Sequence, residues 1–199
     1  MPPIVDADAL VVLGGSMSCQ DDAEAPWLAP TRQLIARTVK AGTPFLGICL
    51  GHQLATVALG GQVCTSDHFC LGAAEMHLTP EGKKDPLLSV YDGHRGIHFN
   101  NDVAVVLPED AVLLARDPTG QIEAVRFAER AWGVQFHPEC TPEIFDAWTI
   151  GHGEKEWQQR LPWSEAVTVA ETVRRDIDTV NAEEAFAARF QELIDPEKR

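Results

Sequence analysis

Cys49 stands in a short motif whose composition could do nucleophilic chemistry, Gly-Ile-Cys-Leu-Gly at residues 47–51. Glycines on both sides of a cysteine are typical of a nucleophile elbow, a sharp turn from a strand into a helix where the two backbones pass close together. A thiol at a helix N-terminus feels the positive end of the helix dipole, which favours the reactive thiolate. The motif therefore predicts a cysteine nucleophile. The alternative is a small buried hydrophobic residue, the usual place of a free cysteine.

His137 and Glu139 could complete that chemistry. The segment Trp132–Glu139 begins as an apolar strand that Pro138 ends, so His137 is expected at the carboxyl end of the strand and Glu139 just beyond it. The carboxyl ends of parallel strands line the active crevice of an α/β sheet. The carboxylate would orient the imidazole, the imidazole would take the thiol proton, and the thiolate would attack an acyl carbon. The alternatives are a core histidine and a glutamate that caps the next helix.

The elements expected around these residues alternate between strands and helices. Strands are predicted at residues 9–13, 44–48, 97–106, 112–116 and 122–127, and helices at residues 27–40 and 50–59. The last three of those strands should form a meander before the strand that leads to His137. Residues 62–91 are expected to be irregular, with a short strand at 76–79 and a turn at 81–84. From Pro142 onward the chain should be helical, and Asn181 is expected to begin its last helix.

Two segments resemble the motifs of the class I (triad) glutamine amidotransferases: Gly-Ile-Cys-Leu-Gly-His-Gln at residues 47–53 and Gly-Val-Gln-Phe-His-Pro-Glu at residues 133–139. The likeness is greatest to free-standing domains similar to the amidotransferase domain of GMP synthase, and it covers about residues 8–148. It implies an α/β, flavodoxin-like fold, an open, mixed, mostly parallel sheet with flanking helices. By this resemblance Cys49 is the nucleophile, His137 the general base and acid, and Glu139 the orienting carboxylate.

The resemblance also implies the other parts of a glutamine site. In the family, a glycine-rich turn and the residue after the nucleophile each give a backbone N–H to the oxyanion hole, and these are Gly15 and Leu50 here. No metal and no organic cofactor is implied. The residues expected to contact the substrate are Gly14, Gln53, Asn100 and Asn101, the two asparagines standing where the family often has a polar turn with histidine.

The start of the chain departs from the family pattern. Members normally have a strand, a helix and a second strand before the strand that matches residues 9–13, whereas only residues 1–8 precede it here. The usual first β-α-β segment would be missing, and residues 9–13 would form an exposed sheet edge, which invites pairing with another chain. The explanations are a natural chain that starts upstream of Met1, a strand supplied by another polypeptide, and a homo-oligomer through that edge. We expect an amidotransferase-like domain over residues 1–150 and a helical extension over residues 151–199 that packs on it.

Other candidate residues carry weaker signals. Cys64, His68 and Cys70 could be soft metal ligands, but their spacing matches no common zinc pattern and no fourth ligand is evident. His94 and His98 are expected in a loop because glycines surround them. The residues expected to serve structure alone are Asp21, Asp22 and Glu24 in a solvated acidic loop, and Trp27, Trp148, Trp157 and Trp163 as packing aromatics.

Composition restricts the partners and the compartment. A net charge of −14 over 199 residues argues against nucleic acid and anionic membranes, which attract basic patches. The chain has 5 cysteines, an odd count without a disulfide framework, and no signal peptide or membrane-spanning run is recognisable, so a reducing cytoplasm is expected.

The function implied by the resemblance is hydrolysis of the glutamine side-chain amide through a cysteine thioester, with ammonia delivered to an acceptor enzyme. The chain lacks the Ser-Gly-Gly-x-Asp-Ser pyrophosphatase signature, so a synthetase partner would be a separate polypeptide. One alternative is a γ-glutamyl peptidase or hydrolase with the same triad. The other is a non-catalytic regulatory subunit that retains the fold.

Overall fold

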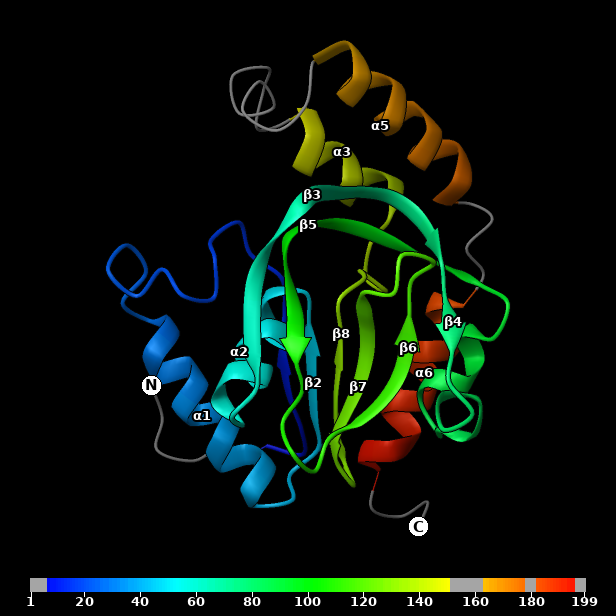
Figure 1. The fold of residues 1–199 in the computed structure, drawn as a ribbon. Helices are drawn as coiled ribbons and strands as arrows, with labels where there is room; N and C mark the ends of the chain where they lie inside the picture. The colour runs from blue at the N-terminus through cyan, green and yellow to red at the C-terminus, as the bar shows by residue number, and fades with distance from the viewer. Residues whose placement is uncertain (1–6, 151–162, 178–181, 196–199) are drawn as a thin grey trace.

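The computed structural model describes residues 7–150, 163–177 and 182–195 (Figure 1). Its main sheet has 6 strands in the order β1-β2-β8-β7-β6-β4. The pairings of β1 with β2 and of β2 with β8 are parallel and the other three pairings are antiparallel, so the sheet is mixed and open. Its strands are β1 (Leu10–Val12), β2 (Phe45–Ile48), β4 (His77–Leu78), β6 (Val112–Arg116), β7 (Ile122–Ala128) and β8 (Ala131–Val134).

Helices cover both faces of this sheet because alternate residues of its buried strands point to opposite sides. Phe45 packs with α1 (Leu28–Lys40) and α2 (Leu50–Ala58) on one face. Its neighbour Leu46 packs on the other face, in the cluster that contains Phe186 and Phe190 of α6. The remaining helical elements are η1 (Gly82–Lys84), η2 (Leu88–Tyr91), α3 (Pro142–Ile150), α5 (Trp163–Ile177) and α6 (Glu183–Ile194).

A second, two-stranded sheet formed by β3 (Gln62–Glu75) and β5 (Arg95–Val106) arches across the molecule below α3 and α5 (Figure 1). The prediction that residues 62–91 are irregular was therefore wrong over β3. Its hydrogen-bond partners lie in a distant segment, and its pairing shifts register between Thr65 and Cys70, which weakens any local pattern. The predicted meander is also shorter than expected, since it contains β6, β7 and β8 while β5 pairs with β3.

The strand expected to end at His137 is shorter, because β8 ends at Val134 and His137 lies three residues beyond it. The other predicted elements agree with the structure to within one or two residues. Of the predicted packing aromatics, Trp27 is wrongly placed, because it is 44% exposed just before α1. In the C-terminal part, α5 packs on β3 and α3, and α6 packs on η2. Asn181 and Trp157 lie outside the described residues, and nothing in the fold tests the division at residue 150.

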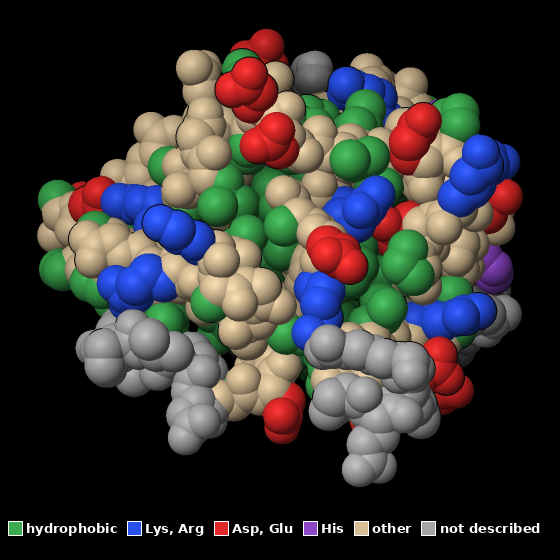
Figure 2. Space-filling view, turned by 90° about the horizontal axis from the view of Figure 1, so that it is seen from below, with side chains coloured by type: hydrophobic (Ala, Val, Ile, Leu, Met, Phe, Trp, Pro, Cys, Tyr) green, Lys and Arg blue, Asp and Glu red, His purple; other side chains and the backbone are tan. Residues whose placement is uncertain are grey.

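The strand β1 is an edge of the main sheet, as the sequence predicts, since it pairs only with β2 among the described residues. Seen from below, the surface of the molecule mixes Lys and Arg with acidic and hydrophobic side chains and shows no single basic patch (Figure 2). Within the described part of the chain, no helix is both long and apolar enough to cross a bilayer.

Candidate active site

Cys49 occupies a strained turn between β2 and α2. Its backbone has φ +50° and ψ −107°, and it is the one non-glycine residue with positive φ in the described ranges. Its N–H donates to the Val134 carbonyl at 2.8 Å, which ties the turn to β8. A Cβ on Gly47 would lie 2.5 Å from the Gly51 carbonyl oxygen, and a Cβ on Gly51 would collide with the Val12 carbonyl. The two glycines therefore permit the close backbone approach that the elbow motif predicts.

His137 and Glu139 form a hydrogen-bonded pair beside this turn. Nδ1 of His137 lies 2.8 Å from Oε1 of Glu139, and the imidazole is almost fully buried. The His137 N–H donates to the Ile97 carbonyl at 2.8 Å, so β5 holds the segment that follows β8. A Cβ on Gly14 would lie 2.9 Å from Cε1 of His137 and 3.6 Å from Cβ of Cys49. The turn after β1 thus lies directly against both side chains and has room only for glycine.

The charge state of His137 follows from its neighbours. Burial alone would lower the pKa of the imidazole, but interactions with Cys49 and Glu139, through hydrogen bonding and negative charge, raise it to about 10. Nε2, the ring nitrogen not engaged by Glu139, has no partner of standard hydrogen-bond geometry. At neutral pH the ring is therefore an imidazolium next to the sulfur, with an Nε2–H that Glu139 does not engage.

Cys49 lies where two cavities meet. A polar cavity of about 290 Å³ extends from it toward Gln53 and Asp102. A second cavity of about 410 Å³ extends toward His137 and Trp148. Both are lined by Gly15, Ser16, Cys49 and Phe99.

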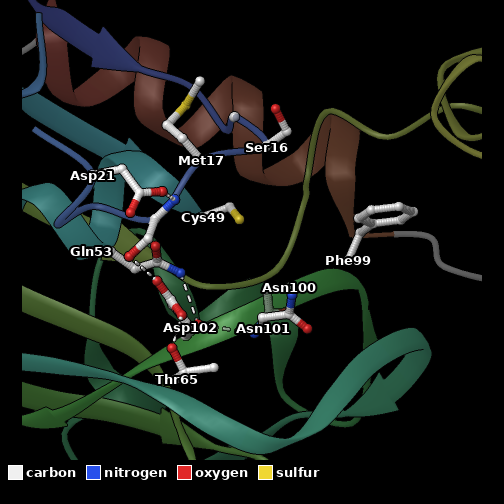
Figure 3. Close-up of a pocket in the computed structure, with 12 residues that line it drawn as sticks. Ser16, Met17, Asp21, Cys49, Gln53, Thr65, Phe99, Asn100, Asn101 and Asp102 are labelled. Atoms are coloured by element: carbon white, nitrogen blue, oxygen red, sulfur yellow. Dashed lines mark hydrogen bonds between the residues drawn. The ribbon is translucent and has the colours of Figure 1, made fainter. Parts of the chain in front are cut away.

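The polar cavity is organised by the carboxylate of Asp102 (Figure 3). Ser18 donates its hydroxyl to Oδ2 at 2.5 Å, and Thr65 donates to Oδ1 at 2.9 Å. Nε2 of Gln53 donates to the Asp102 carbonyl at 2.8 Å, while Gln53 and Phe99 lie on opposite sides of Cys49 in this view. Asp21, whose side chain accepts from the Ser18 N–H at 2.8 Å, also lines the cavity. Asp21 is thus part of a site and not only of a solvated loop.

Most residues predicted for the site lie at these cavities. Gly15, Gln53, Asn100 and Asn101 line the polar cavity, and Gly14 lines the second one. Leu50 follows Cys49 as the first residue of α2, where a backbone N–H has no partner within its own helix. Sequence reasoning missed the cavity residues Ser18, Thr65, Asp102 and Trp148. The available signals were the position of Asp102 next to the predicted asparagines and that of Ser18 in the glycine-rich turn.

Trp148 is a half-buried wall of the second cavity. Its ring lies 4.6 Å from that of His137 and 5.9 Å from that of Phe99, measured between centroids. It was predicted as a packing aromatic, and it does pack, but on the imidazole of the site. The candidate metal ligands Cys64 and Cys70 lie on β3, and the described residues hold no group of three side chains suited to a metal.

His98 is not a loop residue, contrary to the prediction. It lies on β5 with its side chain buried, and its Nε2 is 2.7 Å from Oε2 of the buried Glu123 on β7. Its Nδ1 donates to the Gly96 carbonyl at 3.0 Å. Burial lowers the pKa of His98, yet the negative charge of Glu123 and these hydrogen bonds outweigh it, so the pKa is raised. The result is a second histidine–carboxylate pair, which links β5 to the main sheet.

The fold and the site together define an open α/β protein that holds a cysteine at a strand-to-helix turn beside a histidine–glutamate pair, an arrangement suited to thiol-dependent acyl transfer. The chain belongs to the class I glutamine amidotransferase family, whose sequence model, described as Glutamine amidotransferase class-I, matches residues 3–151.

Similar proteins agree with this assignment. The chain is 32% identical over 161 residues to the glutamine amidotransferase-like protein YfeJ of Salmonella typhimurium, covering 78% of this chain and 66% of that protein. It is 30% identical over 139 residues to a glutamine-hydrolysing GMP synthase subunit of Methanothermobacter thermautotrophicus, covering 67% and 66%. A crystal structure of a glutamine amidotransferase from Methylobacillus flagellatus superposes with a TM-score of 0.81 at 25% identity over 98% of this chain and 80% of that one. The chain thus spans 66% of the length of each of the first two relatives.

Proposed function

We propose that the chain hydrolyses the side-chain amide of glutamine through a thioester on Cys49 and supplies the ammonia to an acceptor enzyme. The observation that carries the proposal is the strained Cys49 turn in the same cavity as the His137–Glu139 pair. A residue held at φ +50° by its surroundings indicates a position under functional constraint, because most side chains avoid that conformation.

The geometry supports a two-step reaction. The Cys49 sulfur attacks the amide carbon. The backbone N–H groups of Gly15 and Leu50 donate hydrogen bonds to the carbonyl oxygen and stabilise the negative charge that develops on it. His137, protonated at neutral pH, gives its Nε2 proton to the departing nitrogen. Water then attacks the thioester, its proton passes to His137, and glutamate leaves. Glu139 holds the imidazole orientation throughout, through its hydrogen bond to Nδ1.

The polar cavity suits the amino-acid end of glutamine. The carboxylates of Asp21 and Asp102 line it, and neither Lys nor Arg is among its described lining residues, so an ammonium group is favoured there. The side-chain amides of Asn100 and Asn101 can donate to the α-carboxylate. Gln53, whose amide N–H groups are engaged by Asp102 and Gln135, forms the wall beside it. This assignment places the side-chain amide of the substrate toward Cys49.

The test is release of ammonia and glutamate from glutamine by the purified chain. Cys49→Ala should lose activity by at least about a thousandfold, because the nucleophile is gone. A diazo-ketone analogue of glutamine should label the wild-type chain at Cys49. A folded wild-type chain, checked by circular dichroism, that neither releases ammonia nor takes the label would refute the proposal and favour the regulatory-subunit alternative.

The acceptor is proposed to be a synthetase on a separate polypeptide, because the similar GMP synthase protein of Methanothermobacter thermautotrophicus is itself one subunit of that enzyme. The odd count of 5 cysteines, without a disulfide framework in the sequence, supports the predicted cytoplasmic location. Association through the β1 edge stays a prediction, as does the separation of residues 1–150 from the extension.

A further inference from the structure

The cavity that contains His137 lies on the side from which a leaving group must depart. His137 lines the 410 Å³ cavity and does not line the polar cavity. The group that protonates the leaving nitrogen has to reach the lone pair of that nitrogen, so the leaving nitrogen lies at the His137 cavity, which is the space open to its substituent. Ammonia, about as large as a water molecule, needs only about 30 Å³. The cavity is therefore far larger than glutamine hydrolysis requires.

The lining of this cavity is largely apolar, which suits an apolar leaving group better than ammonia. Leu13 forms one wall, Ile144 and Trp148 of α3 form another, and Phe99 of β5 separates it from the polar side. Among the described lining residues, Glu139 is the one charged side chain apart from the imidazolium, and there is no Lys or Arg. An apolar group would bury its surface here, whereas a carboxylate would face Glu139, with neither Lys nor Arg among the described lining residues as its partner.

We propose that this cavity binds the N-substituent of γ-glutamyl amides of apolar amines, and that the chain hydrolyses these amides in preference to glutamine. The inference rests on the proposed function, since it uses the same Cys49 thioester and the same γ-glutamyl site. The sulfur forms a bond to the γ-carbonyl carbon, the carbon–nitrogen bond breaks, and the Nε2 proton of His137 goes to the nitrogen, which leaves as the free amine. Water then cleaves the thioester to glutamate and returns the proton to His137.

The test compares three substrates that share the γ-glutamyl group: glutamine, γ-glutamyl-phenethylamide and γ-glutamyl-phenylalanine. Released glutamate is the readout for all of them. We expect kcat/KM for the phenethylamide to exceed that for glutamine by about tenfold or more, because the aromatic ring buries apolar surface in the cavity. The phenylalanine conjugate carries the same ring with an added carboxylate and should be the poorer aromatic substrate.

Variants of the cavity wall connect the preference to the structure. Leu13→Ser and Ile144→Ser should each lower the ratio of phenethylamide to glutamine activity several-fold, since both remove apolar lining. Val167→Ser is the matched control: it also replaces an exposed aliphatic side chain, 37% exposed on α5, but outside both cavities, and should keep the ratio.

The outcomes separate the two proposals. Turnover of glutamine without preferential turnover of the phenethylamide overturns this inference and leaves the glutaminase function standing. A preference that Leu13→Ser and Ile144→Ser do not change also overturns it, because the cavity would not be its source. Failure to process any of the three, without labelling of Cys49 in folded protein, refutes both proposals.

Discussion

Two buried histidines in the described part of the chain each pair with a carboxylate at nearly the same nitrogen–oxygen distance, but their surroundings are opposite. His137 and Glu139 are 2.8 Å apart at a cavity that they share with Cys49. His98 and Glu123 are 2.7 Å apart, with side chains 5% and 2% exposed, and line neither cavity. In both pairs, the partners raise the pKa of the histidine against the effect of burial.

The difference lies in what the second ring nitrogen faces. In His98, Nδ1 donates to the Gly96 carbonyl, so both nitrogens are engaged and the protonated ring is fully satisfied. In His137, Nε2 has no standard partner and faces the site. A raised histidine pKa therefore does not by itself indicate catalysis, because structural ion pairs produce the same shift. The unengaged nitrogen and the nearby thiol distinguish the reactive pair.

The largest effect that separates the pairs should come from Glu139→Gln. We expect kcat for glutamine to fall by about a thousandfold, because a neutral amide no longer fixes the imidazole or stabilises its charge. The melting temperature should fall less than in Glu123→Gln, since the Glu139 side chain is 27% exposed and that of Glu123 only 2%. The comparison variant is Glu129→Gln, at an exposed glutamate after β7, which should keep full activity.

The converse result is expected for Glu123→Gln. Removing one charge of a buried pair leaves the other without compensation, so stability should fall by about 3–5 kcal/mol. For a chain of this size the melting temperature should drop by about 10 °C. Calorimetry or urea unfolding measures the change. A variant as stable as the wild type would show that the His98–Glu123 pair does not hold β5 to the sheet.

His52 extends the comparison to a buried histidine without a carboxylate. Both ring nitrogens lack partners, and burial lowers the pKa of the ring to about 4. The unfolded chain, with a histidine pKa of about 6.5, binds a proton that the folded chain does not, so stability falls as the pH drops below about 6.5. Between about pH 7 and pH 5, the unfolding free energy of His52→Leu should decrease by about 2 kcal/mol less than that of the wild type. Equal losses in both proteins would contradict the assigned shift.

The smallest difference between the two histidine–carboxylate pairs should appear in the pH profile of activity. Because His137 must carry a proton for the leaving nitrogen, kcat/KM should decrease as the pH rises through about 10. Glu139→Gln should move this alkaline limb to lower pH, since the carboxylate raises the His137 pKa. Glu123→Gln should move it much less. Initial rates between about pH 7 and pH 10.5 measure both shifts.

The structural features that could be predicted from the sequence are those that depend on residues close together in the chain. The apolar run before Cys49, the glycines on either side of it and the helical pattern after it all act within a few residues, so strand, turn and helix followed directly. His137 and Glu139 are two residues apart, and their pairing likewise needs no distant information.

The missed features depend on partners far apart in the chain. Glu123 pairs with His98 across 25 positions, and Asp102 accepts from Ser18 across 84. Neither residue carries a local pattern that names its partner. The strand β3 escaped prediction for the same reason, because its stability comes from pairing with β5 and not from its own alternation.

The backbone of Cys49 has a consequence for how variants at this position should be judged. An L-residue at φ +50° and ψ −107° costs about 1–3 kcal/mol, whereas glycine adopts such angles freely. Glycine would therefore be the more stable residue at position 49, and the cysteine is present at a cost in folding free energy. An inactive protein with glycine at this turn can consequently resist heat better than the working one, so a raised melting temperature there would indicate lost chemistry and not an improved enzyme.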